Sequence, residues 1–262
     1  MSLNFDKMTT FLFFKTKKQL LVFAFFTFLL NAGLLAQQSK VWDYPIHYGT
    51  PEWEKLTTFE EMLNAYNIPD SLLKNMTTKD LVATCLKYPN WVLITFGDTY
   101  QEGYDIISKL FNGFKELEQR PDAAKELIDI YCKMDPKGII EFDTPVKQGT
   151  FCLQFTFIEL LISQNKILRT LNKDSKTLVV KTLTINYDIK NGLNNYYSMH
   201  SLLPICLALG RIMEIDKPLI YSSLLTSNSN VNNIIDKGYV SDKNSFDQII
   251  NASKIYLKQL EP

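Results

Sequence analysis

Three side chains are of types that could take part in catalysis: Cys152, Glu159 and His200. Cys152 and His200 supply the thiol and the imidazole of a nucleophilic dyad, in which a base takes the proton of the nucleophile. Glu159 stands inside an apolar run, residues 155–161, and burial there would raise the pKa of its carboxyl, as in some general acids. These residues define one alternative for the function, a divergent hydrolase with Cys/His or Glu chemistry.

The surrounding sequence does not support that alternative. It contains no G-x-S-x-G turn before a nucleophile, no G-x-G-x-x-G and no Walker-type phosphate loop. Its two histidines, His47 and His200, and four cysteines without a C-x-x-C pair are too few and too scattered for a structural zinc site. A lone histidine on a helix is more often a packed or surface residue than a catalytic base. A glutamate in an apolar run more often faces a wet crevice or has a hydrogen-bonding partner than acts as a general acid. The sequence therefore favours a non-enzyme and predicts no cofactor and no metal.

Cys85 could replace Cys152 as the thiol partner of His200. The four cysteines together are compatible with either disulfides or free thiols. An even number in an exported chain permits disulfides. Each cysteine, however, lies inside an apolar helical pattern, where a free thiol packs as a small core residue. We expect buried thiols rather than a disulfide framework at Cys85, Cys132, Cys152 and Cys206.

The N-terminus has the parts of a secretory signal peptide. Three lysines between residues 15 and 18 precede an apolar run at 20–30, and Ala36 precedes polar sequence. The run is interrupted soon afterwards and is short for a membrane span, which needs about 20 apolar residues. We predict a signal peptide at 1–36 and a periplasmic or extracellular protein. The alternative is an uncleaved leader that anchors the chain in the inner membrane.

The charge of the remaining 226 residues argues against two classes of partner. Of 28 basic and 28 acidic residues, the leader carries four lysines and one aspartate, so the remainder has a net charge near −3. Nucleic acids and anionic lipids both call for clustered positive charge. We expect no nucleic-acid partner, and membrane contact only if the leader is retained.

The pattern of apolar residues predicts an all-α fold. Residues 37–55 mix aromatics with turn formers, which favours an extended aromatic arm whose rings pack onto the body over the alternative, an exposed aromatic binding lip. From 56 to 262, apolar residues recur at helical spacing, beginning with a capping-box pair, Thr58 and Glu61. Residues 91–96 fit a helix or a buried strand, and 178–185 carry a minority strand signal.

About nine or ten short helices in antiparallel pairs are expected, as an irregular HEAT-like solenoid or a compact bundle. Similar helical segments at 79–86, 124–131 and 176–183 start 45 and 52 residues apart, near the period of HEAT-like helix pairs. Pro and Gly residues make 135–148 the clearest break, which is either a domain sub-boundary or a longer loop.

A resemblance to a group of known proteins rests on two stretches, 44–53 (Tyr-Pro-Ile through Gly-Thr-Pro-Glu-Trp) and 68–81 (Ile-Pro-Asp-Ser-Leu through Lys-Asp-Leu). Residues 84–89 and 111–117 strengthen it. Across residues 42 to 135 the chain resembles a group of exported bacterial proteins with no known activity. The resemblance implies an exported helical domain from a Gram-negative anaerobe, and it brings no site residues with it.

Together, the leader, the amphipathic helices and the missing catalytic motifs predict an exported helical module that binds a protein or a small molecule. In an enzyme, His200 or Glu159 should meet another polar group in one concave pocket. In a binding module, the two should lie apart and have ordinary surroundings.

Overall fold

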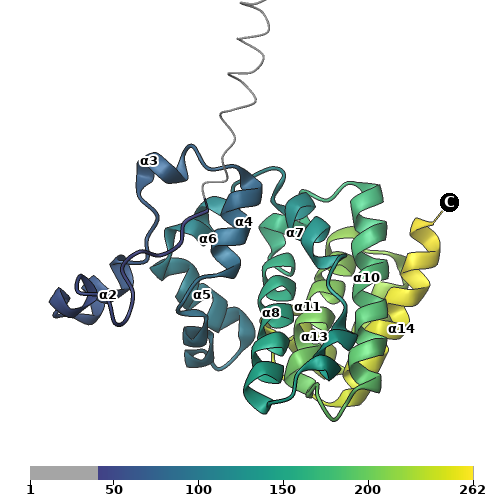
Figure 1. Cartoon of the computed structure of the whole chain (residues 1–262). Coiled ribbons are helices and arrows are strands. Elements are labelled where there is room, and N and C mark those ends of the chain that lie inside the picture. Colours follow the sequence, from purple (N-terminus) through teal and green to yellow (C-terminus); the bar gives the residue numbers. More distant parts are fainter. Residues whose placement is uncertain (1–40, 262) are drawn as a thin grey trace, which may run out of the picture. The chain divides into compact units, whose positions relative to one another are not determined.

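The computed structural model describes residues 41–261, shown in colour in Figure 1. The predicted leader, 1–36, and the first residues of the predicted arm lie outside the described residues. Within 41–261 the chain is all-α and contains no strand, so the predicted fold class is confirmed. The elements are η1 (Trp53–Lys55), α2 (Phe59–Asn64), α3 (Asp70–Leu73), α4 (Thr78–Leu86), η2 (Trp91–Phe96), α5 (Tyr100–Leu110), α6 (Asn112–Leu117), α7 (Ala123–Tyr131), η3 (Pro136–Glu141), α8 (Pro145–Ile162), α9 (Asn165–Leu168), α10 (Lys173–Gly192), α11 (Met199–Asp216), α12 (Leu219–Ser227), α13 (Ser229–Lys237) and α14 (Lys243–Leu260).

Side-chain caps fix where many of these helices begin. Thr58 accepts a hydrogen bond from the backbone of Glu61, whose carboxylate bonds back to Thr58, which completes the predicted capping box. At the start of α4, α5, α8, α10 and α14, the side chain of a threonine, asparagine or aspartate likewise accepts a hydrogen bond from a backbone N–H of the first turn. Such a cap satisfies an N–H that has no partner inside the helix, so short polar residues set the helix boundaries locally.

Helix α11 lies at the centre of the C-terminal half. It packs against α8, α10, α13 and α14, which lie side by side in Figure 1. Thirteen residues from Ser201 to Met213 are buried, including Pro204 and the charged Arg211. A helix that is apolar nearly all round must be covered on every side, which explains why four helices surround it.

The irregular segments also take helical forms. Residues 91–96 form the 3-10 helix η2, which packs on α5 where Gly103 lies directly against the carbonyl of Ile94. Residues 178–185 lie within the long helix α10. From Val41 onward the chain is one compact unit, and the 135–148 segment contains η3, which packs on α8 and α10.

The part of the predicted aromatic arm that lies within the described residues packs onto the helices. Tyr44 is buried, its ring lies near those of Tyr66, Tyr88 and Phe111, and its hydroxyl donates to the carbonyl of Thr84 at 2.8 Å. Burial of several rings in one cluster joins this irregular segment to α4 and α6.

All four cysteines are free thiols. Cys85 and Cys206 are buried, as expected for core thiols, and Cys152 is half-buried. Cys132 is exposed, which corrects the expectation of burial. The reason is its position: it follows the last residue of α7, beyond the packed face of that helix. Separately, no helix between residues 41 and 261 has the length and hydropathy of a transmembrane segment.

Candidate functional site

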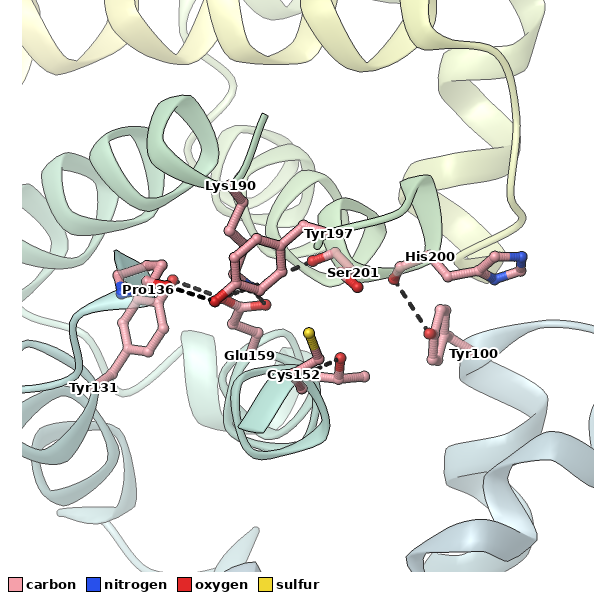
Figure 2. A network of polar contacts seen from close by, with 10 residues as sticks. Tyr100, Tyr131, Pro136, Cys152, Glu159, Lys190, Tyr197, His200 and Ser201 are labelled. Carbon is pink, nitrogen blue, oxygen red and sulfur yellow. Dashed lines mark hydrogen bonds and ion pairs between the residues drawn. The ribbon is translucent and has the colours of Figure 1, made fainter. Parts of the chain in front are cut away.

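The most unusual group in the interior is an ion pair between α8 and α10. Lys190 Nζ lies 2.7 Å from Glu159 Oε1 and 2.9 Å from Oε2, and both side chains have 0 % exposure. Figure 2 shows the two side chains pointing toward each other between the helices. Glu159 is thus buried, and its carboxylate is held by a cation.

Further groups complete the surroundings of this pair. The hydroxyl of Tyr131 donates to Glu159 Oε1 at 2.8 Å, and Lys190 Nζ donates to the carbonyl of Ser201 at 3.3 Å. The ammonium also lies 4.7 Å from the ring centre of Phe155 and 5.5 Å from that of Tyr197. Each charge therefore has several polar or aromatic partners, as a buried ion pair requires.

For both Glu159 and Lys190, burial and ion pairing shift the pKa in opposite directions. Burial raises the pKa of Glu159, while Lys190 and the hydroxyl of Tyr131 oppose that rise. Burial lowers the pKa of Lys190, while Glu159 opposes that fall. Each group thus opposes the effect of burial on the pKa of the other, so the pair is a structural unit whose two members depend on one another.

Cys152 and His200 do not meet in a hydrogen bond. The thiol of Cys152 lies 3.7 Å from the carbonyl oxygen of Tyr196, and burial raises its pKa, which disfavours the reactive thiolate. His200 is exposed, and in Figure 2 its ring points away from Cys152. Its backbone carbonyl accepts a hydrogen bond from the hydroxyl of Tyr100 at 3.2 Å. Cys152 thus lies near the Glu159–Lys190 pair, whose charges act on its pKa, whereas the ring of His200 points away from both.

His200 instead lines an apolar pocket of about 280 Å³, which we call the apolar pocket. Its walls come from η2, the start of α5, the middle of α8, the start of α11 and the α13–α14 loop. The lining residues are Ile94, Thr95, Gly97, Asp98, Thr99, Tyr100, Leu153, Thr156, Phe157, His200, Gly238 and Val240. Leu153, Thr156 and Phe157 share one face of α8, because residues three and four apart lie together on a helix.

The apolar pocket has a rigid wall and exposed hydrophobic neighbours. The ring of Phe157 stacks on Trp91 at 4.2 Å between centres and 7° between planes. Leu153 is 49 % exposed, and next to lining residues in the sequence, Phe96 and Tyr239 are 71 % and 53 % exposed. Exposed hydrophobic residues grouped around a concave site are typical of binding surfaces.

A second pocket, of about 420 Å³, has an almost wholly polar lining, and we call it the polar pocket. It is formed by α5, the end of α6, the α8–α9 connection, α11 and α13. The lining residues are Gln101, Asp105, Ser108, Glu118, Gln164, Asn165, Lys166, Arg211 and Asp236.

Arg211, in the middle of α11, joins these segments. Its Nε donates to the carbonyl of Ile235 at 2.9 Å, and Nη2 donates to that of Asp236 at 2.8 Å. Nη1 donates to the carbonyl of Ser163 at 3.1 Å and to Gln101 Oε1 at 2.6 Å. This side chain is buried and fixes α5, α8 and α13 against α11.

Neither of the two buried cations, Lys190 and Arg211, was predicted from the sequence, although the sequence around each one indicates its burial. Arg211 is the only charged residue in the apolar run 201–213. Lys190 continues the buried stripe of α10 through Val179, Leu183 and Tyr187, at helical spacing. A charge that replaces an apolar residue in such a stripe indicates a buried partner.

Within residues 41–261, no three histidine, cysteine, aspartate or glutamate side chains gather in a way that could hold a metal ion. No family model, curated protein or solved structure matches the chain, so the resemblance to exported bacterial proteins stays a prediction.

Proposed function

We propose that this protein is a binding module that recognises a partner polypeptide through the apolar pocket. The observation that carries the proposal is the composition of that pocket: a stacked aromatic wall, a half-exposed leucine and an exposed histidine, contributed by five separate segments. Interaction sites are dominated by a few apolar anchors inserted into such pockets.

The size of the apolar pocket favours a side chain as its occupant. Pockets for drug-sized ligands measure roughly 300–1,000 Å³, and this one holds about 280 Å³. An aliphatic or aromatic side chain of a partner fits that space, while Phe96 and Tyr239 offer apolar surface to the flanking residues of the partner.

The state of the catalytic candidates also supports binding over hydrolysis. Glu159 is sequestered with Lys190 and does not line the apolar pocket. His200 lines it without a hydrogen bond to Cys152 or Glu159. A nucleophile and base need hydrogen-bond reach of each other.

The proposal places the module outside the cytoplasm, on the strength of the leader sequence alone. Mass spectrometry of the protein from fractionated native cells tests this step. A released chain that starts at Gln37 supports export, and an intact chain in the membrane fraction overturns release.

Selection of displayed random peptides on the full chain tests the binding site. Leu153→Glu places a charge in the apolar pocket. Leu178→Glu is the matched control, because Leu178 lies on α10, does not line the pocket, and is 45 % exposed where Leu153 is 49 % exposed. We expect enriched peptides to share an apolar residue and to lose binding at least tenfold to Leu153→Glu, but not to Leu178→Glu. No enrichment, or equal losses in the two variants, would overturn the proposal.

A further inference from the structure

The apolar and polar pockets meet at the beginning of α5. Tyr100 lines the first and Gln101 the second, while Gly238 lines the first and Asp236 the second. The backbone N–H of Tyr100 donates to the carbonyl of Gly238 at 3.2 Å, which joins the two walls. Since successive Cα atoms are about 3.8 Å apart, only one or two residues separate the pockets on each wall.

The polar pocket offers exposed negative charge. Lys166 Nζ already binds Glu118 Oε2 at 2.7 Å, so these two charges offset each other. Asp105 and Asp236 are exposed at the opening. Asp105 Oδ1 accepts a hydrogen bond from Gln101, and no hydrogen bond to Oδ2 occurs within residues 41–261.

The other cation of the lining, Arg211, attracts both aspartates, but its single positive charge offsets only one of their two negative charges. Its guanidinium is buried, and its three nitrogens donate to backbone carbonyls and to Gln101 Oε1. The hydrogen-bonding capacity left to a partner is therefore chiefly that of carboxylate acceptors, which suit a donor-rich cation.

We infer that the partner segment carries a lysine or arginine close in sequence to its apolar anchor, and that this cation occupies the polar pocket beside Asp105 and Asp236. The inference rests on the proposed function, because the anchor fills the apolar pocket. An extended peptide advances about 3.3–3.6 Å per residue, so zero to three residues between anchor and cation span the junction at Tyr100. The acidic pocket gives the module a preference for basic partners and adds to its rate of association.

Fluorescence anisotropy with defined peptides tests the inference. Each labelled peptide has Leu, Phe or Trp as its anchor, a Gly/Ser spacer of zero to three residues, and Lys, Gln or Glu as its second group. They are titrated into the full chain and into Leu153→Glu, Asp105→Asn and Asp236→Asn. Asp143→Asn is the control, because it removes the same charge from an exposed carboxylate outside both pockets.

We expect the Lys peptides to bind most tightly, and each pocket substitution to weaken them by roughly threefold to fivefold while leaving the Gln peptides unchanged. The Lys advantage should shrink between about 50 and 500 mM salt, because exposed charges are screened.

Different outcomes would overturn the cation inference and the proposed function. If binding depends on Leu153 but Lys and Gln peptides bind equally, or both pocket variants behave like Asp143→Asn, the cation inference is wrong and the proposed function stands. If no peptide shows binding that depends on Leu153, both are overturned.

Discussion

Glu159 and Lys190 form an ion pair with 2.7 Å between Oε1 and Nζ, although 31 residues separate them in the chain and neither side chain is exposed. The pair joins α8 to α10 and, through the carbonyl of Ser201, to the start of α11. Removal of two charges from water is costly and is offset only when every partner is present. The pair therefore specifies how three helices meet, and it makes the stability of the domain sensitive to either residue.

Lys190→Met should strongly destabilise the protein, because it leaves the carboxylate of Glu159 buried without its cation. We expect a loss of about 3–5 kcal/mol in the free energy of unfolding. The double variant Glu159→Leu/Lys190→Met removes both charges and should recover most of that loss. Denaturant titration followed by circular dichroism measures both, and a double variant no more stable than Lys190→Met would contradict this account.

Two glycine-to-alanine changes should have opposite effects. A Cβ at Gly103 would overlap the carbonyl oxygen of Ile94, so Gly103→Ala must separate α5 from η2 and should cost about 1–3 kcal/mol. Gly149, inside α8, has open space around a Cβ, so Gly149→Ala should stabilise the helix by about 0.5–1 kcal/mol. Thermal unfolding of the two variants in parallel checks both signs. Equal effects would show that the contact between η2 and α5 is not tight.

The four thiols should react with a chromogenic disulfide reagent in an order set by burial. Cys132 is exposed and should react first, followed slowly by the half-buried Cys152. Burial raises the pKa of Cys85 and of Cys206, so these two should react only after unfolding. Cys132→Ser should remove the fast phase alone. A fast phase that persists in that variant would contradict the assigned exposure.

Stability should fall in alkaline solution because tyrosines that are buried, such as Tyr88, or partly buried, such as Tyr100, resist ionisation. Burial raises the pKa of Tyr88 and of Tyr100 from 10.0 to about 12. Because the pKa is raised in the folded state, these two tyrosines contribute fully to the free energy of unfolding below pH 10.0. That contribution is lost as pH rises toward about 12. The denaturation midpoint, measured across this range, should decline less in Tyr88→Phe/Tyr100→Phe than in the unmodified protein. Parallel declines would show that other groups cause the alkaline loss.

Much of the helical architecture could be predicted locally. The Thr58–Glu61 capping box determines where α2 begins, and periodic apolar residues identify the long helices. The apolar run 155–161 indicated that Glu159 stands among apolar residues, and the structure buries it there. These properties depend on residues within a turn or two of each other, where backbone hydrogen bonding and side-chain periodicity act directly.

What Glu159 and His200 do in the fold was decided by tertiary structure. Lys190 reaches Glu159 only because α8 and α10 pack together, and the same packing leaves His200 on the wall of the apolar pocket, apart from Cys152. Both pockets unite segments more than 100 residues apart in the chain: α5 meets Asp236 of α13 in the polar pocket, and Gly238, just after α13, in the apolar pocket. The sequence by itself determined the helices and which of their faces are apolar. Only long-range packing, in which burial and desolvation are settled by all neighbouring helices at once, decided the partners of the charged groups and the shape of the surface.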